Sequence, residues 1–122
     1  MNMIRNFLAV GLGGAVGAML RYGMTQLGTA LHWSSNISTF IVNITGSFAM
    51  GLLVCGCAQK SWLLFATVGL CGGFTTFSTF SMQSVTLLQQ GKWGGAALYV
   101  FGTLAVCVLM AWLGFTLGQK LR

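Results

Sequence analysis

The residues with the clearest chemical potential lie in the stretch Gly69–Ser81, where two adjacent glycines precede a run of hydroxyl and phenylalanine side chains. Paired glycines and clustered Thr and Ser are poor material for a continuous helix. We therefore predict a helix that is interrupted near its middle. Inside a membrane, such a break is tolerated only where it is buried in protein or lines a cavity. It then offers N-terminal N–H groups to anions and freed carbonyl groups to small cations.

Two phenylalanines follow this predicted break on one face of the next helical segment. Phe77 and Phe80 are three residues apart, which places them side by side on a helix. The edge of a phenyl ring carries partial positive charge, so rings presented edge-on could contact an anion that has left its water behind. Aromatic residues at this spacing are also common packing residues, and that alternative stays open.

Asn43 is a polar residue well inside a second apolar stretch. An unpaired amide in hydrocarbon costs several kcal/mol, so the side chain must face protein, water or a ligand. A hydrogen bond between helices would satisfy it equally well. The residue belongs to a stripe of small and polar residues at spacing four, which comprises Thr39, Asn43, Ser47 and Gly51.

The last apolar stretch carries a similar stripe, with Tyr99, Thr103 and Cys107 at spacing four. These groups could line a polar track, or the hydroxyls could bond to carbonyls of their own helix. Arg21 is the only cation placed within a predicted span. It could extend its side chain to the nearby interface, or supply a fixed positive potential that attracts anions.

The composition identifies a membrane protein. Of 122 residues, 56% are hydrophobic and 5% are charged, with no Asp or Glu and a formal net charge of +6. So few charges could not cover the surface of a soluble domain. This excludes a disordered chain, a soluble enzyme and a nucleic-acid-binding domain, so we expect lipid and no nucleic acid as a partner.

The missing carboxylates exclude several chemistries as well. Paired acid and base catalysts, Mg²⁺ or EF-hand sites and carboxylate proton relays all need Asp or Glu. No nucleophile–base pair or metal cluster is evident, so an enzyme is not expected. An anion is the more natural partner for a chain without fixed negative charge. The cysteines lie in apolar stretches and indicate small buried thiols rather than disulfides or a metal site: Cys55, Cys57, Cys71 and Cys107.

Four stretches are long enough to cross a bilayer, which takes about 20 apolar residues per helix. They cover roughly residues 5–27, 37–58, 62–90 and 94–118, joined by short polar connections within one domain, 1–122. The Lys and Arg bias predicts both termini in the cytoplasm. Gly13 and Gly17 form a GxxxG step, typical of close helix packing in membranes.

Together these residues resemble the Fluc (CrcB) family of bacterial fluoride channels over nearly the whole chain. Three motifs, in the expected order and spacing, carry the resemblance: Gly13-Gly14-x-x-Gly17-x-x-x-Arg21-Tyr22, Val42-Asn43-x-x-Gly46-Ser47-Phe48, and Gly72-Gly73-Phe74-Thr75-Thr76-Phe77-Ser78-Thr79-Phe80-Ser81.

The resemblance implies an all-α integral membrane protein with four transmembrane helices, the third broken near mid-membrane. It implies an antiparallel, dual-topology homodimer in the bacterial inner membrane, with two fluoride pores that each use residues of both subunits. A structural Na⁺ ion, not transported, would bind backbone carbonyls at the break, here those of Gly72 and Thr75. The residues that match or extend the family's pore are Asn43, Phe77, Phe80, Thr79, Tyr99 and Thr103.

Two positions depart from the family pattern. Gln83 stands where many members carry glutamate, and Cys107 stands where a serine is common. Fluoride is small and strongly hydrated, so its selection requires donors that replace water closely. The Asn43 amide, the hydroxyls of Ser78 and Thr79 and the ring edges would supply them. Passive export fits a negative-inside potential, which provides about 2.3 kcal/mol per charge at 100 mV.

Two other functions compete with this interpretation. A small membrane scaffold or assembly subunit would use every polar stripe for packing alone. A small multidrug-type antiporter has a similar size and topology but needs a membrane-embedded Glu, which this chain lacks.

Overall fold

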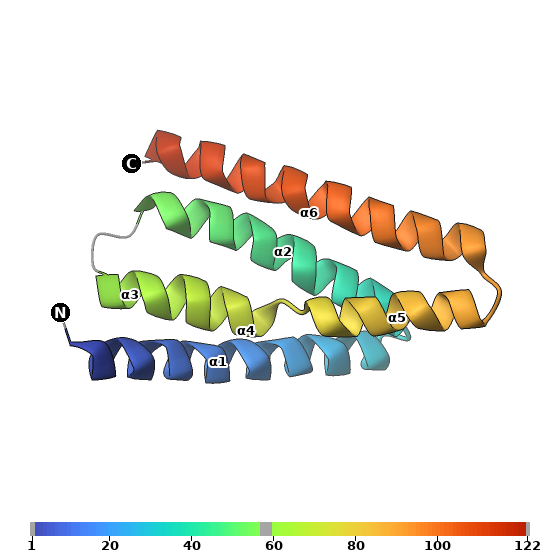
Figure 1. The fold of residues 1–122 in the computed structure, drawn as a ribbon, viewed down its shortest axis with the longest axis horizontal. Coiled ribbons are helices and arrows are strands. Elements are labelled where there is room, and N and C mark those ends of the chain that lie inside the picture. Colours follow the sequence, from blue (N-terminus) through green and yellow to red (C-terminus); the bar gives the residue numbers. More distant parts are fainter. Residues whose placement is uncertain (1, 57–59, 122) are drawn as a thin grey trace.

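The computed structural model describes residues 2–56 and 60–121, and every regular element in that part of the chain is helical. Four helical stretches are long and apolar enough to cross a membrane, and they fall on the four stretches expected from the sequence. Both termini lie at the same end of the molecule (Figure 1). The elements are α1 (Met3–Ala30), α2 (Ser35–Gly56), α3 (Lys60–Leu64), the π-helical η1 (Phe65–Cys71), α4 (Gly72–Phe74), α5 (Phe77–Gln89) and α6 (Trp93–Leu121).

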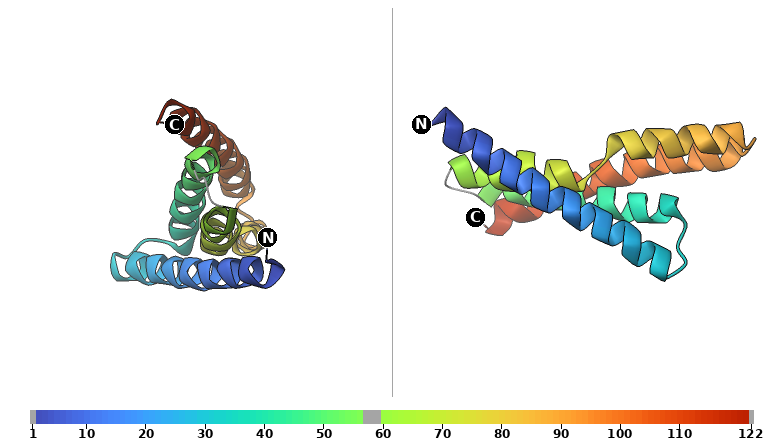
Figure 2. Two further views of the ribbon diagram at one scale, coloured as in Figure 1. Left: turned by 90° about the vertical axis from the view of Figure 1, so that its left-hand side faces the viewer. Right: turned by 90° about the horizontal axis from the view of Figure 1, so that it is seen from below.

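The helices form an elongated stack. Figure 1 shows α2 lying between α6 on one side and the row formed by α3, η1, α4 and α5 on the other. α1 crosses this row obliquely on its far side (Figure 2). α1 therefore packs mainly on η1 and α4, whereas α6 packs on α2 and α5.

Glycines allow the close contact between α1 and the row formed by α3, η1, α4 and α5. Gly13 and Gly17 are buried, and a Cβ atom at either one would collide with a backbone carbonyl, that of Phe65 or of Leu70. Gly73 faces the backbone of Gly14 in the same way. The packing role predicted for the GxxxG step is confirmed, because only glycine allows two helix backbones to approach this closely.

A second glycine contact joins α2 to the C-terminal half of α6. Gly51 lies against the carbonyl of Ala111, and Gly114 lies against that of Phe48. Gly118 continues this contact against Leu52. The stripe that begins at Thr39 thus ends in a packing contact at Gly51.

The row is interrupted between α4 and α5. Thr75 and Thr76 are extended, with ψ of 160° and φ, ψ of −148°, 122°, respectively. The extended residues are the threonines, whereas Gly72 and Gly73 remain helical. The reason is local: Thr76 is the N-cap of α5 and its hydroxyl accepts a hydrogen bond from the Thr79 N–H at 3.3 Å.

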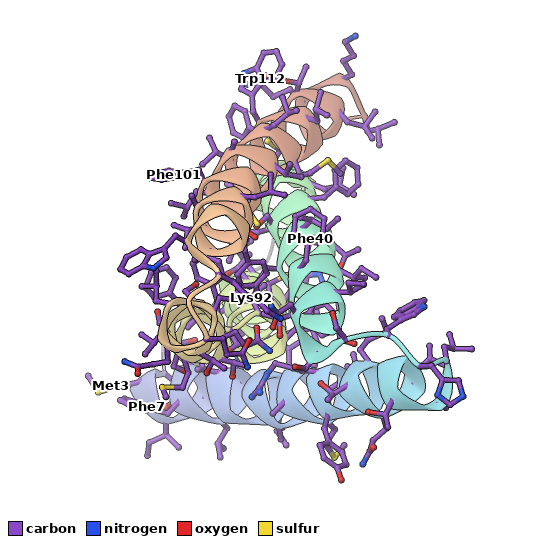
Figure 3. All side chains as sticks on the ribbon, turned by 90° about the vertical axis from the view of Figure 1, so that its right-hand side faces the viewer. Met3, Phe7, Phe40, Lys92, Phe101 and Trp112 are labelled. Atoms are coloured by element: carbon purple, nitrogen blue, oxygen red, sulfur yellow. The ribbon has the colours of Figure 1, made fainter. Side chains whose placement is uncertain are left out.

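The outer surface is strongly apolar. Met3 and Phe7 project outward from α1, and Phe101 and Trp112 project outward from α6 (Figure 3). Water would not favour so large an apolar surface, whereas a bilayer would cover it. The shape and the surface both suit a chain embedded in a membrane.

Candidate functional site

A cavity of about 210 Å³ lies beside the interruption, between α2, α5 and α6. It brings together Asn43, Phe77, Phe80 and Thr103, four residues singled out from the sequence on three different helices. None of the residues that line it carries a charge. The full lining is Asn43, Ser47, Thr75, Thr76, Phe77, Phe80, Thr103, Leu104 and Cys107.

Asn43 is held by two hydrogen bonds to the interrupted backbone. Its side-chain Nδ2 donates to the Thr76 carbonyl at 3.0 Å, and its Oδ1 accepts from the Thr76 N–H at 2.8 Å. The amide thus satisfies the half-buried backbone N–H and C=O of Thr76, which lie at the interruption. The two roles considered for Asn43 coincide, since the same side chain bridges two helices and lines the cavity.

Three aromatic rings form a continuous row, in which Phe77 and Phe80 line this cavity and Tyr99 lines a neighbouring one. Phe77 and Phe80 have ring centroids 5.6 Å apart and an interplanar angle of 47°. Phe80 and Tyr99 follow at 5.1 Å and 48°. The Phe80 side chain is 4% exposed, but that of Phe77 is 71% exposed. Phe80 is therefore fixed by this chain, while Phe77 has a free face.

Thr103 contributes the least satisfied polar atom of the site. Its side chain is 3% exposed, and its Oγ1 atom has no hydrogen-bond partner among the described residues. A buried hydroxyl without a partner is costly, so a native protein that keeps one normally uses it. Thr103 also lines a second cavity, of about 380 Å³, together with Tyr99. It thus lies between two cavities.

Tyr99 is anchored at its polar end. Its hydroxyl donates to Oε1 of Gln83 at 2.6 Å, which joins α6 to α5. Gln83 also lines a groove of about 480 Å³ on the open side of α5, with Ser78 and Thr79. The structure therefore places Ser78 and Thr79 beside the aromatic cavity rather than in it.

Arg21 lies on the opposite side of the interruption, on α1. Its Nε donates to the carbonyl of Gly73 at 3.1 Å, and the residue is half-buried. It is not among the residues that line the cavity. Its charge therefore acts next to the interruption but not inside the aromatic cavity.

The interruption also frees two carbonyl groups of the kind that a hard cation such as Na⁺ prefers. In a continuous helix, the Thr76 N–H would bond to the Gly72 carbonyl, but here it donates to Asn43. Likewise, the Thr79 N–H donates to the Thr76 hydroxyl instead of the Thr75 carbonyl. The carbonyls of Gly72 and Thr75 thus fit the predicted cation ligands. Two oxygens are fewer than a complete coordination shell, so further ligands would have to come from elsewhere.

The electrostatics around the cavity favour an anion. The chain contains no Asp or Glu, so no fixed negative charge opposes one. The N-terminus of α5 begins at Phe77, directly at the cavity, and a helix N-terminus carries partial positive charge. Neutral polar side chains and the rings of Phe77 and Phe80 complete the lining, which can therefore hold an anion without titrating.

The cavity includes residues that the sequence did not single out as site residues. Thr76 pairs with Asn43, and its signal was its place three residues after the glycine pair, directly before the helical segment that begins at Phe77 and needs a cap. Ser47 and Cys107 were noted as members of polar stripes but not chosen as site residues, yet both line the cavity. Cys71 is buried and Cys55 half-buried, while Cys57 lies outside the described residues.

Comparison with known proteins identifies the family of this chain. Residues 8–115 match the family described as CrcB-like protein, Camphor Resistance (CrcB). The fluoride-specific ion channel FluC of Thermus thermophilus is 42% identical over 127 residues, which is 97% of this chain and 97% of the relative. FluC 1 of Listeria monocytogenes is 42% identical over 118 residues, covering 95% and 99% of the two chains. FluC of Methylobacterium nodulans is 45% identical over 105 residues, covering 82% and 85%.

Four apolar helices and relatives of this kind define a multi-pass bacterial membrane protein whose relatives are named as channels, not as enzymes. Within that class, the chain belongs to the CrcB-like family.

Proposed function

We propose that this protein is a fluoride-selective channel that lets F⁻ leave the cytoplasm passively. One observation carries the proposal: an uncharged cavity in which Asn43, Phe77, Phe80 and Thr103 converge at the N-terminus of α5. The relatives named as fluoride-specific ion channels support fluoride as the ion. Hydroxyl, amide and ring-edge donors can replace the water of a small anion without any proton transfer.

The selectivity follows from the size and rigidity of the lining. Fluoride holds its water tightly, so an ion enters only if fixed donors replace that water at short distance. Asn43 and Phe80 are fixed by their contacts with Thr76 and Tyr99, and Thr103 keeps a free hydroxyl for the ion. A larger anion such as chloride would not fit the same donors as closely and would gain less from them.

The pathway is incomplete in one subunit, which supports a homodimer. Phe77 is 71% exposed although its neighbour Phe80 is buried, and the groove with Ser78 and Thr79 is open on the same helix. A second subunit would cover these polar and aromatic groups. We propose an antiparallel, dual-topology homodimer with two pores, each completed by residues of both subunits.

The freed carbonyls of Gly72 and Thr75 support a structural Na⁺ ion at the centre of this dimer. Each subunit would supply the same two oxygens, which doubles the ligand number. The ion would fix the interruption in its extended form and would not be transported. Arg21, bonded to the carbonyl of Gly73, would stabilise the same turn and add a positive potential for anions nearby.

Fluoride efflux from liposomes tests the proposal. Purified protein is reconstituted in vesicles loaded with potassium fluoride, valinomycin is added, and a fluoride electrode follows the release beside a chloride control. We expect rapid loss of F⁻ without loss of Cl⁻, reduced at least about tenfold by Phe80→Ile. A folded protein that releases no fluoride would refute the channel and favour a scaffold in which the same residues only pack.

A further inference from the structure

Cys107 lies in the proposed ion path. It lines the 210 Å³ cavity with Asn43, Phe77 and Phe80, and its side chain is half-buried. Thr103, four residues earlier on α6, presents its unpartnered hydroxyl on the same helix face and lines the same cavity. A thiol and an unpaired hydroxyl are thus adjacent groups in the lining of one cavity.

The other described thiols have different surroundings. The Cys55 thiol donates to the carbonyl of Phe115 at 3.5 Å. Cys71 is 4% exposed and faces a separate apolar cavity with Leu20 and Phe74. Among the thiols that the structure describes, Cys107 alone shares a cavity with the aromatic row.

We propose that Cys107 is a binding site for soft, thiophilic metal ions inside the pathway, and that its occupation blocks the passage of fluoride. This inference rests on the proposed function. Thiolate sulfur is the preferred protein ligand of soft metals. No charged residue lines the cavity to compete with the thiol for the metal.

The reaction with methylmercury chloride, a probe with one reactive site, illustrates the chemistry. The S–H bond of Cys107 breaks and an S–Hg bond forms, while the Hg–Cl bond breaks and chloride leaves. The proton passes to water, and nothing is oxidised or reduced. The bound methylmercury group then occupies space that the ion requires, and excess dithiothreitol removes it.

The test compares fractional inhibition, each variant measured against its own untreated flux. The variant Cys55→Ser/Cys57→Ser/Cys71→Ser retains only Cys107, and we expect methylmercury to lower its fluoride efflux at least about tenfold. Cys107→Ser, with Cys107→Ala as a second thiol-free variant, should keep its own untreated rate when the reagent is added. Intact-protein mass spectrometry should show one methylmercury adduct on the variant that retains only Cys107.

A matched control places a thiol on the outer surface of the same helix. Val108 is 69% exposed and is not among the residues that line the cavity. In a chain with all four native cysteines replaced by Ser, Val108→Cys should be labelled without loss of flux. Labelling of Cys107 without inhibition, inhibition that persists in both Cys107 variants, or failure to label Cys107 would each overturn the inference. Absence of flux in untreated protein would instead refute the proposed function, and the mass measurement would still decide whether Cys107 reacts.

Discussion

Two regions of this molecule place different side chains at their helix contacts, and the contacts differ accordingly. Where α1 crosses η1 and α4, the residues are glycines, and backbones meet with no room for a Cβ atom. Where α2, α5 and α6 meet, the residues are Asn43, Thr103 and phenylalanines, and cavities remain between the helices. Side-chain size decides the difference, because glycine lets helices close completely, whereas rings and branched hydroxyl residues hold them apart.

The glycine contact of α1 with η1 and α4 helps to fix the position of the cavity between α2, α5 and α6. η1 and α4 are held tightly by α1, and the extended residues Thr75 and Thr76 follow directly. Asn43 then ties Thr76 to α2. The cavity is therefore positioned by the closely packed helices next to it. Substitutions in the packed region should mainly lower stability, whereas substitutions in the cavity should mainly lower fluoride efflux.

The largest effect is expected in the closely packed region. Gly17→Ile would drive a side chain into the backbone of Leu70 and Phe74, and overpacking of this kind typically costs about 1–3 kcal/mol or more. We expect a lower yield of monodisperse protein by size-exclusion chromatography and a lower melting temperature in detergent. Gly11→Ile is the matched control, since a Cβ there meets nothing within 4 Å. Equal behaviour of the two variants would argue against a support role for this contact.

Asn43→Ala should affect both stability and flux. It removes the partners of the half-buried N–H and C=O of Thr76, at a cost of up to about 1–3 kcal/mol for each group. We expect a lower melting temperature together with slower fluoride efflux. Asn43→Asp retains an acceptor for the Thr76 N–H but brings a negative charge, so it should recover part of the stability and none of the flux. Recovery of flux in that variant would contradict an anion path past Asn43.

Thr103→Val should lower fluoride efflux without lowering stability. The substitution preserves shape and removes a hydroxyl that has no partner, so the melting temperature should stay equal or rise. Fluoride efflux should fall severalfold, because the ion loses a donor. Thr116→Val, on the same helix but outside the cavity, serves as control. Unchanged efflux in Thr103→Val would remove this residue from the path.

Tyr99→Phe should have the smallest effect. The ring contact with Phe80 is retained, whereas the hydrogen bond to Gln83, worth about 0.5–1.5 kcal/mol, and the side-chain hydrogen bond with Thr39 are lost. We expect a slightly lower melting temperature and a smaller change in efflux than for Thr103→Val. A larger change would show that the tyrosine hydroxyl itself meets the ion.

Much of the fold and part of the site could be anticipated from residue patterns. The four apolar stretches and the GxxxG contact follow from length, hydropathy and residue size, which act locally along the chain. Asn43, Phe77 and Phe80 could be singled out as candidate site residues, but the sequence did not give the position of the cavity that they share. Thr76 escaped notice because its importance depends on a partner 33 positions away.

The sequence by itself determined that this protein resides in a membrane, that its helices must pack through glycine and that no carboxylate can take part in its chemistry. These properties depend on composition and on spacing along a single helix. Only the tertiary structure decided that Asn43 bonds to Thr76, that Thr103 keeps a free hydroxyl, that Arg21 lies outside the aromatic cavity and that Cys107 lies inside it. Such facts depend on how separate helices cross, and backbone contacts between distant residues set those crossings.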